Sequence, residues 1–399
     1  MADIYKAVKL TDKVYWVGAI DWTIRDFHGY TTHRGSTYNA YLILADKITL
    51  VDTVKAPFRE ELISRIASVV DPRDIEIIVS NHSEMDHTGC LYELIDLIQP
   101  EQVVASTMGT KTLGDIYHRE RTITPVKDGG ELSLGNMRLR FMETRMLHWP
   151  DSMFSYLPEE EILFSHDAFG MHLATAERFD DEIDPAILDY EGATYFANII
   201  LPYAPLVTRL LSRVGSSGMT FKFIAPDHGP IWRRDIPGVI ANYSRWAAQK
   251  PTMKSVVVYG TMWHSTERMA RAICEGLAAA GAAAKCMSME VFHRSDVVYE
   301  VLDAGALIVG SSTLNNNMLP QVADVLTYLK GLRPANLLGA SFGSYGWSGE
   351  AAVHIADILK EMKVSPVAEP LKAQHVPTRE DLRKCYALGE EIARKLGEK

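Results

Sequence analysis

Four side chains that could bind metal ions lie within six consecutive residues of this chain. They are His82, Glu84, Asp86 and His87. The apolar run 75–79 precedes them and predicts a buried strand, and residues 91–98 carry apolar side chains at helical spacing. We therefore expect the four groups on a loop at the carboxyl end of a strand, where a rigid scaffold aims functional side chains. The alternative is an ordinary solvated polar turn.

A complete metal site needs ligands from elsewhere, and three candidates each follow a strand-like segment. They are His148, Asp167 and His228. They could converge on one edge of the sheets, although each alone could be a hydrogen-bonded turn residue. Together with the first loop they give four histidines, one glutamate and two aspartates, which is enough for two metal ions.

Length and charge limit the class of protein. At 399 residues, the chain exceeds what one hydrophobic core usually holds, so two domains are expected. A net charge of −10 argues against nonspecific nucleic-acid binding. The sequence has no apolar run of about 18 residues, so no membrane span is expected. The first six residues lack the apolar core of a signal peptide, which makes the cytoplasm the expected location.

The four cysteines do not form a metal-binding motif. None is spaced as Cys-x-x-Cys, which excludes a zinc ribbon, a rubredoxin-type iron site and a ferredoxin cluster within this chain. We expect reduced thiols, mostly buried, and a packing role for Cys90 beside the ligand loop.

Residues 1–250 alternate short strands with helices, which predicts sheets packed on each other and covered by helices. The expected strands are 14–17, 40–44, 48–52, 75–79, 102–105, 137–141 and 162–164. The expected helices are 59–69 and 90–98, with a mostly helical stretch at 188–214 that Pro202 and Pro205 interrupt.

The rhythm changes after a boundary at 247–254, and strand and helix then alternate strictly. The expected strands are 255–259, 284–290, 306–310, 337–342 and 364–368, and the expected helices are 265–280, 320–332, 349–362 and 378–396. This alternation is typical of a doubly wound parallel sheet.

Three polar loops follow strands of this second domain. The loop 261–266 places hydroxyl groups before a helix N-terminus, which suits a phosphate, although an ordinary helix cap is the alternative. It has neither a G-x-G-x-x-G pattern nor a Walker lysine. The loops 310–317 and 341–350 lie at the same carboxyl edge and could flank a flat ring, with Tyr345 or Trp347 as its aromatic face.

The motif His-x-Glu-x-Asp-His, followed by the separate His148, Asp167 and His228, resembles the metallo-β-lactamase fold. Most hydrolases of that superfamily have histidine where this chain has Glu84, and they bind zinc. A carboxylate makes the site harder and more anionic, which suits iron better than zinc.

With the alternating domain after residue 250, the chain resembles the flavodiiron proteins (A-type flavoproteins). The implied fold is mixed α+β and α/β: a metallo-β-lactamase-like αββα sandwich (1–250), then a flavodoxin-like doubly wound parallel sheet (251–399).

The resemblance implies a ligand set for two irons. His82, Glu84 and His148 would hold one, and Asp86, His87 and His228 the other, while Asp167 and a solvent oxygen would bridge them. In some family members the histidine at the position of His87 is swung away and replaced by water. His28, His172 and Tyr195 could donate a hydrogen bond or proton near the metals, or could be packed polar residues.

The resemblance to flavodoxin implies bound FMN, with its phosphate in the first polar loop and its isoalloxazine between the other two. The residues expected to bind it are Thr261, Met262, Trp263, His264, Ser265, Thr266, Ser311, Ser312, Thr313, Leu314, Asn315, Asn316, Ser344, Tyr345, Gly346, Trp347, Ser348 and Gly349. Many flavodoxins have glycine where this chain has Trp263 and His264.

The activity implied by the family is reduction of nitric oxide to nitrous oxide, of dioxygen to water, or of both. The family also implies a head-to-tail homodimer or homotetramer, in which the FMN of one chain serves the irons of another. The electron donor would be a separate rubredoxin, or a reduced deazaflavin as in some methanogens. Alternatives are a mainly dioxygen-reducing enzyme, a dizinc hydrolase with an added flavodoxin domain, and an electron-shuttling module without catalysis.

The role assigned to Glu84 can be tested directly. Replacing it in the variant Glu84→His should lower the iron content of the purified protein, because a softer imidazole replaces a hard carboxylate. Elemental analysis of iron and zinc measures the change. Unchanged iron content and unchanged activity would contradict the role given to this residue.

Overall fold

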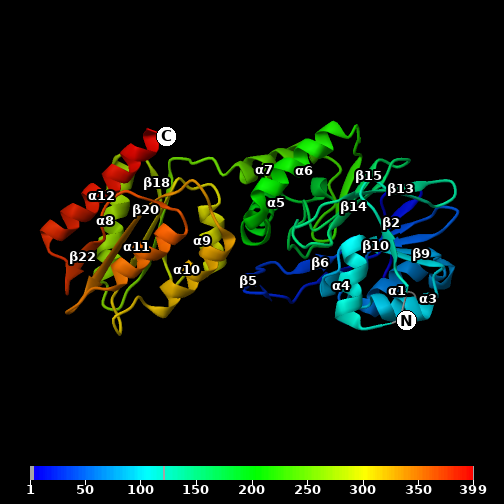
Figure 1. Cartoon of the computed structure of the whole chain (residues 1–399), viewed down its shortest axis with the longest axis horizontal. Helices are drawn as coiled ribbons and strands as arrows, with labels where there is room; N and C mark the ends of the chain where they lie inside the picture. The colour runs from blue at the N-terminus through cyan, green and yellow to red at the C-terminus, as the bar shows by residue number, and fades with distance from the viewer. Residues whose placement is uncertain (1–3, 120–121, 399) are drawn as a thin grey trace. The chain divides into compact units, whose positions relative to one another are not determined.

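The computed structural model describes residues 4–119 and 122–398, which form two compact units (Figure 1). The first comprises 4–28, 32–195 and 205–244, and the second comprises 29–31, 196–204 and 245–398. Residues 1–3, which begin the segment inspected for a signal peptide, lie outside the described residues. The domain limits expected from the sequence, 1–250 and 251–399, stay a prediction.

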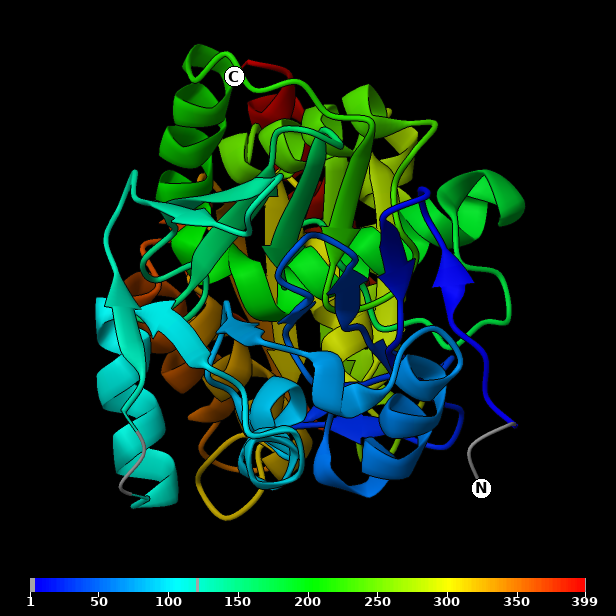
Figure 2. The same cartoon turned by 90° about the vertical axis from the view of Figure 1, so that its right-hand side faces the viewer.

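The first unit contains two large sheets. In spatial order, the first has β1 (Val8–Lys9), β2 (Val14–Trp16), β7 (Tyr41–Ile43), β8 (Thr49–Val51), β9 (Ile77–Ser80), β10 (Gln102–Ser106) and β11 (Thr124–Val126). The second has β12 (Glu131–Ser133), β13 (Arg138–Glu143), β14 (Met153–Leu157), β15 (Ile162–His166) and β16 (Phe223–Pro226). Figure 2 shows the first sheet in blue to cyan and the second in teal to green. A short ribbon pairs β3 (Ala19–Asp21) with β6 (Ser36–Tyr38), and two further short strands are β4 (Asp26–Phe27) in the first unit and β5 (Tyr30–Thr31) in the second.

The central strands of the first sheet are buried on both faces. In β8, Leu50 belongs to the core on the helix-covered face, whereas Val51 belongs to the core between the two sheets. Ile78 and Val79 of β9 divide in the same way, because successive side chains of a strand point to opposite faces. Burial on both faces explains why these strands appear in the sequence as continuous apolar runs.

Helices cover the outer faces. Leu62 of α1, Leu94 of α3 and Leu113 of α4 contribute to the core against the first sheet. Behind the second sheet, Phe154 packs on Phe169, whose ring contacts Tyr243 of α7. The α-helices are α1 (Arg59–Ala67), α2 (Met85–Thr88), α3 (Leu91–Ile98), α4 (Thr107–Tyr117), α5 (Pro185–Tyr195), α6 (Ala204–Ser216) and α7 (Ile236–Ala248). Shorter helical turns of the first unit are η1 (Ala56–Phe58), η2 (Pro72–Asp74) and η3 (Asp180–Glu182), whereas η4 (Phe196–Ile200) and η5 (Leu201–Tyr203) belong to the second unit.

The second unit is built on a parallel sheet in the order β18-β17-β19-β20-β21, with β22 also paired to β20. Its strands are β17 (Lys254–Gly260), β18 (Ala283–Ser288), β19 (Ala306–Ser311), β20 (Leu338–Tyr345), β21 (Ser365–Pro366) and β22 (Leu371–Gln374). Its helices are α8 (Ser265–Ala279), α9 (Arg294–Val301), α10 (Pro320–Leu332), α11 (Ala351–Glu361) and α12 (Arg379–Gly397). The first four strands have the flavodoxin-like order.

The expected sandwich and doubly wound sheet are confirmed. The expected strand pair 40–44 and 48–52 is the antiparallel pair β7–β8. The helical stretch 188–214 contains α5 and α6, separated by η4 and η5 around Pro202. One local expectation was wrong: Asp86 and His87 lie on the one-turn helix α2 rather than on a loop. None of the helices in the described ranges combines the length and hydrophobicity that a membrane crossing requires.

The close approach of α8 and α12 gives a stability prediction. A Cβ on Gly389 of α12 would lie 2.2 Å from the carbonyl oxygen of Ile273 on α8. We expect Gly389→Ala to lower the free energy of unfolding by about 1 to 3 kcal/mol, because the two helices must separate to admit the methyl group. The urea midpoint of the full chain measures this change.

Gly331 in α10 is the matched control, because a Cβ there meets nothing within 4 Å. Gly331→Ala should be neutral or should stabilise the protein by up to about 1 kcal/mol, through helix propensity alone. Equal midpoints for the two variants would contradict the tight contact between α8 and α12.

Candidate metal centre and flavin pocket

Seven possible metal ligands converge in the first unit, in two adjoining groups. His82, Glu84, His148 and Asp167 form one group, and Asp86, His87 and His228 form the other. Within each group the ligand atoms lie within 4.8 Å of one another. All seven residues proposed from the sequence are therefore brought together, although they come from four separate segments.

Asp167, directly after β15, lies between the two groups. Its Oδ2 is 2.9 Å from His148 Nε2 and 3.3 Å from His82 Nε2. Its Oδ1 is 3.2 Å from His87 Nε2 and 3.4 Å from His228 Nε2. Each oxygen thus faces one group, which is the arrangement that a carboxylate needs to bridge two cations.

The outer nitrogens of two histidines are held by neighbouring groups. His228 Nδ1 lies 2.6 Å from the carbonyl oxygen of Thr37. His82 Nδ1 lies 3.2 Å from the carboxylate of Asp151, which also accepts the backbone N–H of Ser83 at 2.6 Å. A proton held on Nδ1 leaves the lone pair of Nε2 free to bind a metal, so these contacts fix the tautomer and the ring orientation.

The ring of His87 also points into the site. Its Nε2 faces Asp86 Oδ1 at 3.4 Å and Asp167 Oδ1 at 3.2 Å, and its Nδ1 lies 3.5 Å from Asp227. In this structure the ring of His87 therefore faces the other possible ligands.

The site is strongly anionic. Burial opposes protonation of His82, but Asp151, Glu84 and Asp167 together raise its pKa well above the usual value. Burial likewise opposes ionisation of Asp167, yet the surrounding imidazoles hold the pKa of this carboxyl well below its ordinary range. A cluster that favours protonated histidines so strongly would also favour metal cations.

Several buried atoms in the centre have no hydrogen-bond partner among the described residues. They are both carboxylate oxygens of Asp86, both ring nitrogens of His87 and Oδ1 of Asp167. Buried polar atoms without partners are costly unless something satisfies them. Mixed imidazole and carboxylate donors fit two first-row metal ions, so the residues present are suited to the implied pair of irons.

The three proposed neighbours of the metals lie at different depths. His28 is largely exposed, and its Nε2 is 3.6 Å from Glu84 Oε1. Tyr195, at the end of α5, is fully buried, with its ring centre 5.1 Å from that of His172 and 6.2 Å from that of His228. Burial, aided by the charge of Asp167, raises the pKa of Tyr195 well above its usual value, so its phenol stays protonated.

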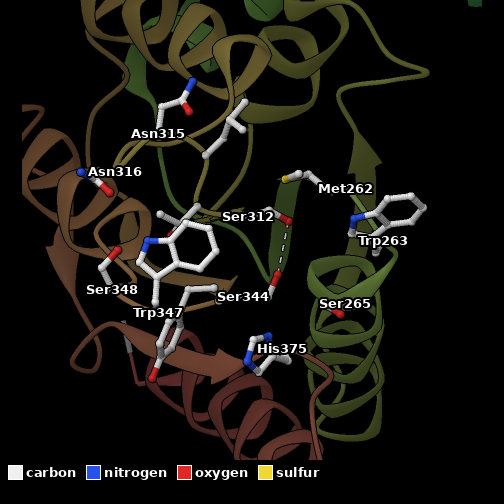
Figure 3. Close-up of a pocket in the computed structure, with 14 residues that line it drawn as sticks. Met262, Trp263, Ser265, Ser312, Asn315, Asn316, Ser344, Trp347, Ser348 and His375 are labelled. Atoms are coloured by element: carbon white, nitrogen blue, oxygen red, sulfur yellow. Dashed lines mark hydrogen bonds between the residues drawn. The ribbon is translucent and has the colours of Figure 1, made fainter.

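The second unit has a pocket of about 590 Å³ at the carboxyl edge of its parallel sheet. Figure 3 shows Trp263 and Trp347 on opposite sides of it, and these side chains are 85% and 88% exposed. The lining residues are Met262, Trp263, Ser265, Ser312, Thr313, Leu314, Asn315, Asn316, Ser344, Tyr345, Gly346, Trp347, Ser348 and His375. Its volume and two exposed indoles suit a flat aromatic ligand.

A cluster of hydroxyl groups joins the three segments around this pocket. Ser312 Oγ and Ser344 Oγ are 3.2 Å apart (Figure 3). Thr266 Oγ1 lies 2.8 Å from Ser344 Oγ and 3.0 Å from Ser312 Oγ. The buried hydroxyl of Thr261 has no hydrogen-bond partner among the described residues. Hydroxyls and the N-terminus of α8 fit a phosphate, so the residues present are suited to FMN.

Five residues expected to bind FMN do not line the pocket: Thr261, His264, Thr266, Ser311 and Gly349. Ser311 has a structural role, because its hydroxyl accepts the backbone N–H of Leu319 and donates to the carbonyl of Ser312. The side chain of His264 is exposed and pairs with Glu267 at 2.7 Å.

Sequence reasoning missed His375, which follows β22, and the carboxylates behind the metal ligands. Asp151 and Asp227 lie close to His148 and His228 in the chain. Asp52 ends the apolar run of β8, and its carboxylate accepts the backbone and side-chain N–H groups of Asn81, both at 2.7 Å. Burial raises the pKa of Asp52 to about 6. In the sequence, these carboxylates could have been recognised because each is an aspartate close to a metal ligand or at the end of a neighbouring strand.

Fold and site together define the class of the protein: a metallo-β-lactamase-type unit with a two-metal ligand set, joined to a flavodoxin-type unit. Residues 37–229 match the family described as ODP family beta lactamase, and residues 257–389 match flavodoxin.

Relatives extend this likeness over the whole chain. A nitric oxide reductase of Moorella thermoacetica is 46% identical, covering 98% of this chain and 99% of the relative. The structure of rubredoxin oxygen:oxidoreductase from Desulfovibrio gigas superposes with a TM-score of 0.97 at 44% identity, covering 98% of this chain and 99% of that one. The flavodiiron protein of Giardia intestinalis gives a TM-score of 0.96 at 33% identity, with 100% and 98% covered. The chain belongs to the flavodiiron protein family.

The contact between Asp151 and His82 generates a prediction about metal binding. Asp151→Asn should weaken metal binding by about 10- to 100-fold, because the neutral amide no longer favours the imidazole tautomer that binds metal. Metal affinity can be measured by competition with a chelator of known strength. Asp115→Asn, on the exposed face of α4, is the control and should leave the affinity unchanged. Equal affinities in the two variants would show that Asp151 does not support the site.

Proposed function

We propose that this chain is an oxidoreductase that reduces nitric oxide to nitrous oxide at a two-iron centre that receives electrons from FMN. Reduction of dioxygen to water at the same centre is the alternative main activity. The observation that carries the proposal is the division of the Asp167 oxygens between two groups of ligands. Membership of the flavodiiron family and the flavin-sized pocket support it.

We assign the seven donors to two irons. His82, Glu84 and His148 would hold one iron, and Asp86, His87 and His228 the other, with Asp167 between them. When bound, the irons and FMN supply the electrons for reduction of the diatomic gas. An additional bridge by a solvent oxygen stays a prediction.

The protein supplies position and protons. Asp151 and Thr37 hold the rings of His82 and His228 with Nε2 directed inward. Trp149 lies edge-on to His82, with 5.2 Å between ring centres, and packs against that ring. Tyr195, which burial keeps protonated, is proposed as a hydrogen-bond or proton donor to bound substrate. The exposed His28 is proposed to orient the carboxylate of Glu84.

The flavin site is proposed as the three loops around Thr266, Ser312 and Ser344. The N-terminal end of α8 would bind the phosphate, and Trp347 with Tyr345 would cover the ring. Thr261 and Thr266 do not line the pocket and would act through their buried hydroxyl groups.

The partners are also proposals. The Desulfovibrio gigas relative bears the name rubredoxin oxygen:oxidoreductase, which supports a rubredoxin as the electron donor here. A head-to-tail homodimer or homotetramer remains the expected assembly.

The activity can be tested by anaerobic turnover of purified protein whose iron and FMN contents have been measured. With reduced rubredoxin as donor and matched concentrations of the two gases, we expect faster consumption of nitric oxide, with one nitrous oxide formed per two nitric oxide molecules. A dominant dioxygen rate would reverse the order of the two activities. Consumption of neither gas by iron-loaded protein, or zinc bound in place of iron, would refute the proposal.

A further inference from the structure

Two of the four cysteines lie close together at the edge of the second unit's sheet. Cys274 is half-buried on α8, and Cys286 is exposed on the edge strand β18. The expectation of mostly buried thiols was therefore wrong for this pair. It holds for Cys90 and Cys385, which are fully buried.

The strand register places Cys286 on the side of the sheet that α8 covers. Cys286 lies opposite Val257 of β17, and residues opposite each other on neighbouring strands share a face. Val257 belongs to the core formed with Ile273 of α8, and Cys274 packs against that same core. Figure 1 shows α8 beside β18, so the two cysteines lie on packed elements and next to the same core.

The environment makes the two thiols unequal. The neighbouring Cys274 thiol lowers the pKa of Cys286, and the positive charge of Arg271, one turn earlier on α8, lowers it further despite burial. The neighbouring Cys286 thiol raises the pKa of Cys274 well above its usual value. Cys286 is thus the more exposed of the two thiols, and the directions of the two pKa shifts make it the more acidic one. A reactive thiolate next to a second thiol is the arrangement found in redox-sensitive cysteine pairs.

We propose that Cys274 and Cys286 form a peroxide-reactive dithiol that closes reversibly to an intrachain disulfide. The Cys286 thiolate attacks a hydroperoxide, the O–O bond breaks, and the sulfur becomes a sulfenic acid as water or alcohol leaves. The Cys274 thiol then attacks that sulfur, forming the S–S bond and releasing water. In total, two thiols are oxidised, one peroxide is reduced, and a dithiol reductant restores the thiols.

The pair is separate from the machinery of the proposed function. Cys274 lies nine residues along α8 from Ser265, about 13 Å at the rise of an α-helix. Neither cysteine lines the flavin pocket or belongs to the metal ligands. The disulfide would tie α8 to β18 without entering either site, so the proposal stands or falls independently of gas reduction.

The test is peptide mapping of the full-length holoprotein after brief treatment with hydrogen peroxide and alkylation of the remaining thiols. Lys285 lies between the two cysteines, so trypsin separates residues 272–285 from 286–294. We expect these two peptides to appear joined, two hydrogens lighter than their sum, and to separate after dithiothreitol. The peptides of Cys90 and Cys385 serve as internal controls and should remain alkylated in full.

Two variants distinguish the roles of the thiols. Cys286→Ser should abolish the reaction with peroxide at Cys274. Cys274→Ser should leave the reaction at Cys286 but stop it at the sulfenic acid, which dimedone traps on peptide 286–294. Joined peptides that come from two different chains would overturn the proposal, as would equal dimedone labelling of Cys286 in the wild type and in Cys274→Ser.

Discussion

The burial of Asp167 is the constraint on which the first unit depends. This carboxylate is 1% exposed, and each of its oxygens faces two imidazole nitrogens. A buried charge is costly unless opposite charge lies close to it. Because the neighbouring imidazoles must be neutral to bind metal, the compensating charge has to come from cations. The geometry around Asp167 therefore makes sense as a site for two metal ions.

The fold satisfies this constraint by bringing four chain segments to one edge of its two sheets. Asp167 follows β15, His228 follows the parallel neighbour β16, and His82 follows β9 of the first sheet. A further shell of carboxylates lies behind the ligands: Asp151 contacts His82, and Asp227 lies beside His87. Burial and the nearby Asp52 raise the pKa of Asp227 well above its usual value, so this carboxyl is costly to ionise in the metal-free chain. The site thus lowers the stability of the metal-free chain but holds the metal ligands in fixed positions.

The second unit positions its binding site by a different arrangement of strands and loops. A parallel sheet brings the loops after β17, β19 and β20 to one edge, where a ligand can bind without disturbing the core. The hydroxyls of Thr266, Ser312 and Ser344 join these loops by hydrogen bonds, so the pocket is formed before any ligand arrives. At the outer edge, the exposed strand β18 leaves Cys286 within reach of solvent.

The sequence alone determined the ligand types, the approximate strands and the change of rhythm near residue 250, because these depend on local spacing and on burial patterns. It identified the metal-site residues because each segment that carries them follows a strand-like segment of the sequence. It could not identify β22, a short strand with one buried residue, and so it missed His375.

Only the tertiary structure decided which polar neighbours face the site. His166 is adjacent to Asp167, but its Nε2 lies 2.9 Å from the Thr144 hydroxyl and its Nδ1 accepts the backbone N–H of Asp167, so both ring nitrogens are already engaged. The pairing of Cys274 with Cys286 likewise required the packing of α8 on β18, which no local pattern encodes.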